Sequence, residues 1–531
     1  MLLIYPPVVR STEPPLGIAR LAGFIRARGM PVRLLDLNHE GMEYLLASMT
    51  SLSDCTPSGM DGQSHGEQGR ADTWTHGAVL RTTRNLASLR SLQTYRNLSR
   101  YSRAVGDLSR VLRLATAPFG AEASLANYAE NRRTPLRRQD LLDAAARYTD
   151  SPYFRFFSRR IEEELDRQPA TVVGFSINYL SQALPAFAIL GWLSQVHPEL
   201  RRVAGGGLVN SWLTQGSLAC DDSLGGLLHA LIPGRGEDSP SAWLDSAGQH
   251  VERDPKHPAW ASQPDFDDFG HLEYLSPVRI IPYTFSCGCS WKRCTFCPEK
   301  AEGGRYAGLR VDDAMSQLGQ LARRCKAELF HFTDNEIAPL YLRGMAEHSS
   351  GIPWYGFARF SRALLDPGFC HALAASGCRM LQLGLESADQ QVLDAMGKGT
   401  ELAKIDQILE NLAMAGIGTF LYVLFGTPSE DLSAARKTRD FLADRADLIA
   451  FLNVAIFNLP VASTEAALLN TRDFYAGSLS LYRDFEHPAG WNRAAIRSFI
   501  NRELEAEPRI RGIIKRSPPV FTSNHAVFFL E

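Results

Sequence analysis

Short, wholly apolar runs alternate with longer amphipathic segments along most of this 531-residue chain, and this alternation limits the folds it can adopt. The run LLIY (2–5) is followed by PPLGIARLAGFIRARG (14–29), which begins with prolines, repeats apolar residues at helical spacing and stops at a glycine. VRLLDLN (32–38) supplies the next apolar run. A strand, a helix and a strand in this order predict two parallel strands joined by a right-handed crossover.

The same pattern resumes at TVVGFSI (171–177), which precedes a helix at about 181–196 and strands at 202–207 and 230–237. Together the five strands predict an α/β domain at 1–245 with a doubly wound, flavodoxin-like sheet. Such sheets bind ligands beyond the carboxyl ends of their strands. The turns at those ends are rich in glycine, which lets the backbone come close to a ligand.

A mostly helical insertion is expected at about 42–165, between the second and third strands. It opens with a polar, glycine-rich stretch (53–73) that predicts a mobile loop. Residues 80–138 then contain twelve arginines against three acidic residues. Two readings stay open for this basic segment: a solvated helix face, or a docking surface for an acidic substrate or leader peptide.

A second α/β series follows a linker at 246–277 that is rich in proline, aspartate and aromatic residues. Six further strand runs alternate with helices such as the one predicted at 401–416, and they favour a full or partial (β/α)6 TIM-type barrel at 278–460. The remaining residues, 461–531, are predicted to cover the barrel mouth. The six strand runs lie at 278–285, 327–337, 352–360, 379–387, 418–431 and 448–457.

Charge, apolar runs and cysteine usage indicate a cytoplasmic protein. The formal net charge of −2 argues against general binding to nucleic acids or to membrane surfaces. The N-terminal run lacks the basic flank and the length of a signal peptide, and no apolar run is long enough to span a membrane. Nine cysteines, an odd number, do not suit a secreted disulfide framework.

Four of the nine cysteines lie within CGCSWKRCTFC (287–297), directly after the first strand of the second series. Thiolates bind soft metals, so zinc and an iron–sulfur cluster are the candidates. A structural zinc site takes four protein ligands, and four cysteines are present. Alternatively Cys289, Cys294 and Cys297 hold three irons of a four-iron cluster and leave the fourth iron open, with Cys287 either a bystander or an alternative first ligand.

Polar residues stand at the carboxyl ends of several predicted barrel strands, where the active sites of such barrels lie. Each residue alone is more often a helix cap or a surface charge, but together they face the same mouth as the cysteine loop. They are Asp334, Glu336, Arg359, Glu386, Ser387, Gly426 and Glu430.

The second series resembles the radical S-adenosylmethionine (SAM) superfamily over residues 278–457. The resemblance rests on Phe296 within CTFC, on GLESADQQVLDAMGKG (384–399) and on AGIGTFLYVLFGTPSED (415–431). It implies that Cys289, Cys294 and Cys297 ligate a [4Fe-4S] cluster whose open iron chelates SAM, and that cleavage of SAM gives a 5′-deoxyadenosyl radical. The residues that it places at SAM are Phe296, Asp334, Glu336, Arg359, Glu386, Ser387 and Gly426.

Two departures from that family's pattern concern the cysteines and the second strand. Four residues separate Cys289 from Cys294, where three are commonest in the family. The sequence DNE (334–336) stands where the family often has Gly-Gly-Glu, which weakens the implied contact with the SAM amino group.

The first series resembles the cobalamin-binding domain that precedes this core in one large subfamily, over residues 1–41 and 171–240. That subfamily's histidine motif, Asp-x-His-x-x-Gly, is absent after the first strand. DLNHEG (36–41) has the wrong spacing, so His39 is predicted to be a surface residue and cobalamin to bind without a histidine beneath it. The residues that the resemblance places at cobalamin are Leu16, Gly17, Ser176, Asn178, Gln182, Gly206, Gly207, Gly234, Gly236 and Glu237.

Taken together, the resemblances imply a cobalamin-dependent radical SAM enzyme, most simply a C-methyltransferase acting on an unactivated carbon of a natural product, lipid or peptide. The alternative is a rearrangement, cyclisation or bond-forming enzyme in which cobalamin has a non-methylating role. Either enzyme needs an electron donor such as flavodoxin or ferredoxin. The sequence names no catalytic residue; His487 and His525 could be acid–base groups or structural histidines.

Two other classes fit the sequence less well. RNA methylthiotransferases carry a further cysteine trio in their N-terminal domain, whereas only Cys55 and Cys220 precede the cysteine loop here. A non-catalytic cobalamin sensor would need neither the cysteine loop nor the polar strand ends.

Overall fold

The computed structural model divides into two compact units. The first unit is built on Met1–Pro277 and the second on Val278–Ala476 and Ser480–Pro518. The predicted loop at 53–73, with Cys55, and the predicted linker as far as residue 260 lie largely outside the described part of the chain. The described residues are 1–54, 73–238, 261–348, 350–519 and 525–530.

The first unit contains a five-stranded sheet in which every pair of neighbouring strands is parallel. Its order is β2-β1-β5-β6-β7, which is the flavodoxin-like order once the strands of the sheet are counted in sequence. The predicted doubly wound fold is therefore confirmed. The strands are β1 (Leu2–Tyr5), β2 (Arg33–Asp36), β5 (Val172–Ser176), β6 (Arg201–Gly205) and β7 (Ala230–Leu231).

Three helices connect the strands of this sheet: α1 (Leu16–Arg26), α9 (Leu180–Val196) and α10 (Gly207–Thr214). Helix α9 is apolar on nearly all sides because the insertion packs against it on the side away from the sheet. At Gly191 the approach is so close that a Cβ atom would lie 1.9 Å from the carbonyl oxygen of Ala145 in the insertion.

The insertion is mostly helical, and its helices bury the apolar residues whose spacing predicts them. Tyr101, Val105, Leu108 and Leu112 lie on the buried face of its longest helix. The elements are α2 (Leu37–Asp54), α3 (Thr73–Leu80), α4 (Thr82–Leu89), α5 (Leu92–Tyr95), α6 (Leu98–Thr116), the hairpin β3 (Ala121–Ala123) and β4 (Tyr128–Glu130), α7 (Arg138–Ala146) and α8 (Phe154–Arg167).

The prediction that His39 lies on the surface is wrong. Helix α2 starts at Leu37, directly after β2, and buries the imidazole completely. The His39 Nδ1 atom lies 2.6 Å from the Ser11 hydroxyl, and the ring packs on Tyr274 with 4.7 Å between centroids. Burial lowers the pKa of His39 to about 3, so the imidazole is neutral.

Asp36, at the end of β2, is buried in the same polar cluster. Its carboxylate accepts hydrogen bonds from the Tyr274 hydroxyl, at 2.8 Å, and from the His39 backbone, at 3.0 Å. Burial raises the pKa of Asp36 to about 7. Tyr274 belongs to the segment predicted as a linker, and Leu275 beside it is also buried. The described end of that segment is therefore packed against the first unit.

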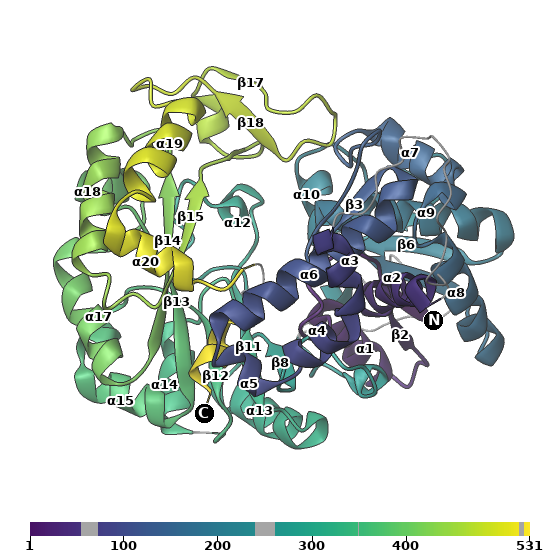
Figure 1. Ribbon diagram of the computed structural model, residues 1–531, viewed down its shortest axis with the longest axis horizontal. Coiled ribbons are helices and arrows are strands. Elements are labelled where there is room, and N and C mark those ends of the chain that lie inside the picture. The colour runs from purple at the N-terminus through teal and green to yellow at the C-terminus, as the bar shows by residue number, and fades with distance from the viewer. Residues whose placement is uncertain (55–72, 239–260, 349, 520–524, 531) are drawn as a thin grey trace. The chain divides into compact units, whose positions relative to one another are not determined.

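The second unit contains six parallel strands in the order β15-β14-β13-β12-β11-β8, a partial barrel as the sequence predicts. Helices α13, α14, α15, α17 and α18 lie along the outer side of the strands (Figure 1). The strands are β8 (Ile280–Tyr283), β11 (Leu329–Phe332), β12 (Trp354–Ala358), β13 (Cys378–Glu386), β14 (Gly418–Phe425) and β15 (Phe451–Ile456), and the helices are α13 (Val311–Cys325), α14 (Pro339–Glu347), α15 (Pro367–Ala375), α16 (Gln390–Ala395), α17 (Ile405–Met414) and α18 (Leu432–Asp444).

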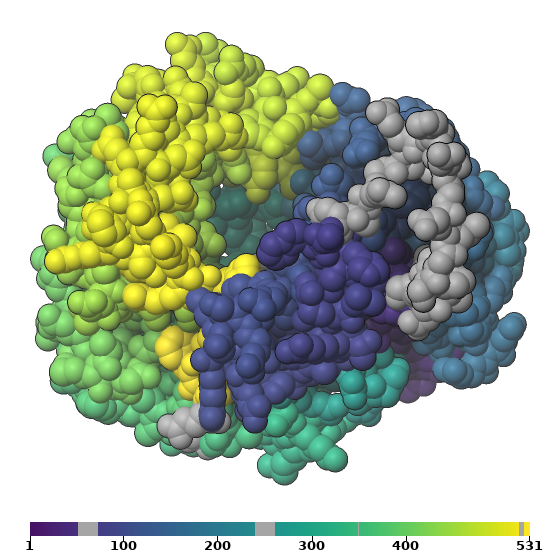
Figure 2. Space-filling view, in the orientation of Figure 1, coloured from purple at the N-terminus to yellow at the C-terminus, as the bar shows by residue number. Residues whose placement is uncertain are grey.

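The C-terminal region begins with a small antiparallel sheet, β16 (Leu459–Pro460), β17 (Thr471–Asp473) and β18 (Tyr482–Phe485). Helices α19 (Arg493–Phe499) and α20 (Pro508–Arg516) follow and form part of the surface of the second unit, in yellow in Figure 2.

Residues 461–531 are predicted to cover the barrel mouth, but only part of this C-terminal region lies there. The Phe499 ring contacts Phe425 at the carboxyl end of β14, with centroids 5.4 Å apart. The final described residues pack at the opposite end of the same strand, where the His525 ring stacks on Phe420. His525 is buried there among aromatic rings, away from the mouth.

No helix within the described ranges combines the length and the apolar character that crossing a membrane requires.

The Asp36 cluster makes the stability of the first unit depend on pH. The pKa of Asp36 is about 7 in the folded chain, against an ordinary value near 4 in the unfolded chain. The unfolded chain therefore releases this proton first as pH rises, and folding becomes less favourable until pH passes the folded pKa. We expect Asp36→Asn to gain about 3 kcal/mol relative to the parent chain between pH 5 and pH 8.

Denaturant unfolding at several pH values measures this difference. Asp166→Asn is the matched control because Asp166 is an exposed carboxylate of the same unit. Stability curves of the parent chain and Asp36→Asn that run parallel from pH 5 to pH 8 would contradict the assignment.

Candidate functional site

The cysteine loop leaves the sheet at the carboxyl end of β8. It starts in β9 (Ser286–Cys287), which pairs antiparallel with β10 (Ala307–Gly308), and ends in the short helix α12 (Pro298–Ala301). Cys287 is thus part of a strand pair, opposite Ala307. The other three cysteines lie beyond that strand, on the loop itself.

Cys289, Cys294 and Cys297 share one electrostatic environment. Burial raises the pKa of the Cys294 thiol, and Lys398 and Arg359 oppose that rise. Burial also raises the pKa of the Cys297 thiol, and the nearby thiols of Cys294 and Cys289 raise it further. Three thiols that influence one another, with two cations beside them, form a donor set that suits an anionic thiolate-bound cluster.

Asp334 holds the base of the loop. Its buried carboxylate accepts hydrogen bonds from the backbone N–H groups of Phe285 and Ser286, at 3.0 and 2.8 Å, and from the Ser286 hydroxyl at 2.6 Å. Burial raises the pKa of Asp334, and the Ser286 bond opposes this. Both carboxylate oxygens are engaged by the protein, so the geometry gives Asp334 a role in positioning the loop rather than the predicted role at SAM.

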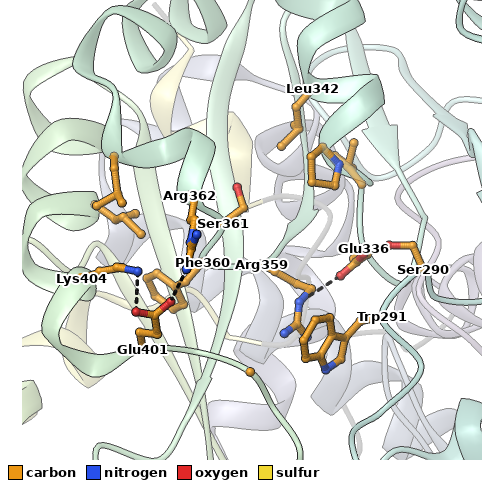
Figure 3. Close-up of a pocket in the computed structure, with 15 residues that line it drawn as sticks. Ser290, Trp291, Glu336, Leu342, Arg359, Phe360, Ser361, Arg362, Glu401 and Lys404 are labelled. Carbon is orange, nitrogen blue, oxygen red and sulfur yellow. Dashed lines mark hydrogen bonds and ion pairs between the residues drawn. The ribbon is translucent and has the colours of Figure 1, made fainter.

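Glu336, two residues further on, turns toward the middle of the loop. It accepts a hydrogen bond from the Ser290 hydroxyl and forms an ion pair with Arg359, Nε to Oε2 at 3.4 Å (Figure 3). The Glu336 side chain is buried, and its Oε2 atom has no hydrogen-bond partner among the described residues. A buried carboxylate oxygen without a hydrogen bond is a candidate contact for a ligand.

The Arg359 guanidinium, at the end of β12, connects four parts of the site. Its Nη1 atom lies 3.9 Å from the Cys294 sulfur, and its Cζ atom lies 4.4 Å from the centroid of the Trp291 ring. It also donates to the carbonyl oxygen of Lys398 and pairs with Glu336. The predicted residue Arg359 therefore lies beside a predicted cluster ligand.

The turn after α16, residues 396–399, packs against the cysteine loop. The Trp291 indole donates to the Gly397 carbonyl at 2.8 Å, and the Thr295 backbone N–H donates to Met396 at 2.9 Å. Gly399 has a φ of +68°, and a Cβ atom there would lie 2.1 Å from the Trp291 ring. The glycines of the MGKG sequence are therefore required by a close approach between two loops.

Lys398 lies within this turn, and its ammonium group reaches the end of β13. It pairs with Glu386, Nζ to Oε1 at 2.7 Å, and lies 5.6 Å from the centroid of the Phe296 ring. The pair crosses Gly384, where a Cβ atom would lie 2.4 Å from the Glu386 carboxylate. Glu386 itself has a φ of +64°, an uncommon backbone conformation that often marks a functional residue.

Phe296 and Ser387 both face the protein interior. Phe296 packs against a buried cluster formed by Val392, Leu393, Met396 and Ala434. Ser387 is fully buried, and its hydroxyl lies 3.4 Å from that of Thr438 on α18. Both residues lie next to the predicted site. The Phe296 side chain packs in the hydrophobic core, and the Ser387 side chain contacts helix α18.

Gly426 and Glu430 form a turn beyond β14. The Gly426 backbone N–H and the Trp491 indole both donate to Oε2 of Glu430, while its Oε1 atom is buried without a hydrogen-bond partner in the described residues. Burial raises the pKa of Glu430 to about 7. His487 bonds the Thr427 carbonyl at 2.9 Å and is thus a structural contact of the same turn.

A cavity of about 250 Å³ adjoins the cysteine loop on the side of α14 and α17 (Figure 3). Ser290, Trp291, Glu336 and Arg359 line one wall of the cavity, and Arg362, Glu401 and Lys404 line another. Its walls therefore carry both signs of charge.

In the first unit, the residues predicted at cobalamin gather at the carboxyl edge of the sheet. Asn178 joins two of the turns: its Nδ2 donates to the Ser176 hydroxyl at 3.0 Å, and its Oδ1 accepts from the Gly207 backbone at 2.9 Å. Gly206 has a φ of +105°, and a Cβ atom there would lie 2.6 Å from the Ile177 carbonyl oxygen. The turn after β6 therefore requires glycine.

Gln182 is fully buried and joins the ends of β1 and β5. Its amide donates to the Pro6 carbonyl at 2.8 Å and accepts from the Asn178 backbone at 2.8 Å. It positions the turns and is not exposed on them. Among the other predicted contacts, Gly17, Gly207 and Gly234 are exposed, Leu16 and Gly236 are half-buried, and Glu237 is buried with a pKa that burial raises.

The described residues contain no group of three or more His, Cys, Asp and Glu side chains placed to hold a metal ion. A four-iron cluster is larger than a single metal ion, and each cysteine binds a different iron, so the three sulfurs need not converge on one point.

Four residues at this site were not identified from the sequence: Ser290, Trp291, Lys398 and Trp491. Trp291 and Lys398 lie inside stretches that carry the family resemblance, CGCSWKRCTFC and GLESADQQVLDAMGKG. A glycine on each side of Lys398 signals a close backbone approach, but the partner of that approach is more than a hundred residues away in the sequence.

Residues 283–442 match the model of the Radical SAM superfamily. This part of the second unit is therefore similar to the radical SAM superfamily, as its sequence predicts. The match includes the cysteine loop, Glu336, Arg359, Glu386 and Gly426.

Two relatives of known function are similar to parts of the chain. The bacteriochlorophyllide d C-12(1)-methyltransferase of Chlorobaculum tepidum is 28% identical over 177 residues, which are 31% of this chain and 37% of that protein. The 4′-phospho-dehydrooxetanocin synthase of Priestia megaterium is 22% identical over 239 residues, which are 40% of this chain and 32% of that protein. The chain thus matches less than two fifths of the length of either relative.

Solved structures with similar architecture include two enzymes. One is the radical SAM methyltransferase TsrM from Kitasatospora setae, with a TM-score of 0.48 and 14% identity over 86% of this chain and 73% of that one. The other is OxsB, a cobalamin-dependent SAM radical enzyme, with a TM-score of 0.49 and 14% identity over 68% of this chain and 64% of that one.

The contact between Gly399 and Trp291 gives a direct test of how the cysteine loop is held. Alanine at a positive φ costs about 1–2 kcal/mol, and at residue 399 its methyl group would also displace the Trp291 ring, at a further cost of about 1–3 kcal/mol. We expect Gly399→Ala to lower the melting temperature and to lower the iron retained after anaerobic reconstitution with iron and sulfide.

Gly416→Ala is the matched control, because Gly416 has a φ of +73° and open space around its missing Cβ atom. It should lose stability from backbone strain alone and retain its iron. Equal iron contents in the two variants would show that the turn does not support the loop.

Proposed function

We propose that this protein is a cobalamin-dependent radical SAM enzyme and, most simply, a C-methyltransferase. The observation that carries the proposal is the set of three thiols, Cys289, Cys294 and Cys297, on one loop at the carboxyl end of a parallel barrel. Arg359 and Lys398 lie beside the buried member of that set. When bound, the cluster and SAM supply a carbon radical, and cobalamin supplies a methyl group.

The residues of the second unit have distinct roles in this proposal. Cys289, Cys294 and Cys297 hold the cluster. Glu336 and Glu386 are the polar contacts for SAM, and Gly426 lies near its adenine. The Oε2 atom of Glu336 pairs with Arg359 but accepts no hydrogen bond from the described residues. Asp334 positions the base of the cysteine loop. Arg359 fixes the loop to the strand ends and places a positive charge beside the cluster ligand Cys294.

The first unit is proposed to bind cobalamin at the carboxyl edge of its sheet. Its contacts are the exposed or half-buried turn residues Leu16, Gly17, Ser176, Asn178, Gly206, Gly207, Gly234 and Gly236, with Gln182 and Glu237 behind them. The order of this sheet places its switch point between β1 and β5, and Gly17 and Ser176 lie on either side of it. No histidine of the β2–α2 turn is available to the cobalt, because His39 is buried against Ser11 and Tyr274.

The substrate is proposed to be a natural product, lipid or peptide with an unactivated carbon, and the one-electron donor a flavodoxin or ferredoxin. The similarity to a methyltransferase that acts on a bacteriochlorophyllide supports methyl transfer. The similarity to 4′-phospho-dehydrooxetanocin synthase supports the alternative, a rearrangement or bond-forming reaction in which cobalamin transfers no methyl group.

Anaerobic reconstitution followed by metal analysis tests the cofactors. We expect about four iron atoms and one cobalamin per chain in the parent protein. Cys289→Ser, Cys294→Ser and Cys297→Ser should each lose most of the iron, because each removes one of three ligands. Cys287→Ser is the matched control and should keep it. One zinc per chain, with no iron, would refute the proposal; loss of iron in Cys287→Ser but not in Cys289→Ser would revise the ligand set.

Product analysis tests the reaction class. Methyl transfer should form S-adenosylhomocysteine and 5′-deoxyadenosine together when the loaded enzyme is incubated with SAM, reductant and candidate substrates. Formation of 5′-deoxyadenosine with a changed substrate but without S-adenosylhomocysteine would contradict methyl transfer and favour the alternative.

A further inference from the structure

The helical insertion of the first unit carries a group of arginines that the proposed site does not use. Residues 82–116 contain seven arginines and one acidic residue, Asp107. The Asp107 carboxylate is already occupied, because it accepts hydrogen bonds from Arg81 at 2.8 Å and from Asn85 at 3.0 Å. Five of the seven arginines are exposed and form no ion pair with any residue that the structure describes. We call these five the arginine face: Arg84, Arg96, Arg100, Arg103 and Arg113.

Helix α6 spaces three of these arginines along one side. The opposite side of the helix is apolar and buried, and the residues between the arginines are small: Ser99, Ser102, Gly106 and Ser109. The α-helical rise places Arg100 and Arg113 about 20 Å apart along the axis. Small neighbours leave the guanidinium groups accessible, so α6 carries a row of positive charge. The segment from α3 to α6 forms part of the surface of the first unit (dark blue in Figure 2).

Exposed apolar side chains lie in the same insertion. Of the nine large apolar side chains that are exposed in the described part of the chain, three belong to residues 74–119. Trp74 is 72% exposed and Leu80 is 64% exposed, and both lie on α3, which packs against α6. Phe119, which is 48% exposed, lies in the turn that ends α6. An ordinary solvated helix face carries polar and charged residues, whereas this surface combines arginines with apolar side chains.

From these residues we propose that the insertion binds to a membrane surface that contains anionic lipids. The guanidinium groups of the arginine face pair with lipid phosphates, which suit their planar arrangement of donors. Trp74, Leu80 and Phe119 lie among the headgroups and the first carbons of the acyl chains, where aromatic and apolar side chains are stable. The contact is peripheral and needs none of the cofactors of the proposed function.

The apolar residues favour a lipid surface over an acidic peptide or a nucleic acid. Carboxylates or phosphates alone would use the arginines and leave Trp74, Leu80 and Phe119 in water, whereas a bilayer interface takes up both kinds of side chain. The formal net charge of −2 disfavours attraction of the whole chain to an anionic surface. The arginine face acts locally, because salt screens charges that are more than about 8–10 Å away.

Co-sedimentation of the full chain with lipid vesicles tests the proposal. One set of vesicles is phosphatidylcholine alone, and the other is phosphatidylcholine with an equal amount of phosphatidylglycerol. We expect the parent chain to bind the mixed vesicles at least about tenfold more tightly, because several arginines meet anionic lipid. Arg100→Glu with Arg103→Glu should remove most of this preference, and its effect should shrink as salt is raised. Trp74→Ser should weaken binding several-fold at every salt concentration, because salt does not screen apolar contacts.

Two matched controls separate the proposed surface from general effects of charge and apolar area. Arg502→Glu with Lys515→Glu makes the same change of charge on exposed residues of the second unit. Leu468→Ser removes an apolar side chain of that unit that is 83% exposed. Both control variants should bind the vesicles as tightly as the parent chain does.

Equal binding of the parent chain to the two kinds of vesicle, or no binding to either, would overturn the proposal. Unchanged binding in the Arg100/Arg103 and Trp74 variants would overturn it as well. Binding of soluble polyglutamate without binding to vesicles would replace the lipid surface by an acidic peptide. Iron and cobalamin contents are measured in separate experiments, so a failure of the proposed function is distinguishable from a failure of this proposal.

Discussion

The site of the second unit depends on the placement of one largely buried cation, the guanidinium of Arg359. A charge removed from water is costly unless polar partners surround it, and this guanidinium meets a carboxylate, a carbonyl oxygen, a sulfur atom and an aromatic face. Those partners come from the end of β11, from the 396–399 turn and from the cysteine loop. Each of these segments therefore helps to compensate the charge of Arg359, and through this side chain the three segments are held together.

Glycines make this arrangement sterically possible. The 396–399 turn can approach Trp291 only because Gly399 has no side chain, and Lys398 can reach Glu386 only because Gly384 leaves the space between them open. The same turn thus presents its backbone to one partner and its lysine to another. The segment GLESADQQVLDAMGKG carries part of the resemblance to the radical SAM superfamily. Its glycines are needed because the 396–399 turn and the cysteine loop pack closely against each other.

Much of the fold could be predicted from the sequence because each buried parallel strand is a short, wholly apolar run with a turn at its end. The strand ends could be located for the same reason, so Glu336, Arg359 and Gly426 were correctly placed at the carboxyl edge of the barrel. The direction of a side chain at such an end could not be predicted. Asp334 turns under the loop, Ser387 turns to α18 and His39 is buried by a helix that starts two residues earlier.

The errors have one physical origin, which is that the deciding partners are distant in the sequence. Asp334 is fixed by Phe285 and Ser286, and His39 by Ser11 and Tyr274. His525 packs on Phe420 at the amino end of β14, although its place near the C-terminus suggested the mouth. The periodicity of apolar residues along the chain does not reveal contacts between residues distant in the sequence. In the structure, a positive φ or the lack of space for a Cβ atom at a glycine marks such contacts directly.

The two units solve one structural problem in the same way. In each, a buried polar side chain bonds the backbone of a neighbouring strand's end: Gln182 ties β5 to Pro6, and Asp334 ties β11 to Phe285 and Ser286. These bonds satisfy backbone groups that the strands leave unpaired at their ends, so the turns hold their shape without depending on a ligand. Gly207 in the first unit is exposed although its N–H donates to Asn178, and Oε2 of Glu336 in the second unit pairs with Arg359 without a hydrogen bond. The residues best suited to bind a ligand are therefore those that keep an exposed backbone or an oxygen atom without a hydrogen bond, beside the buried side chains that hold the turns.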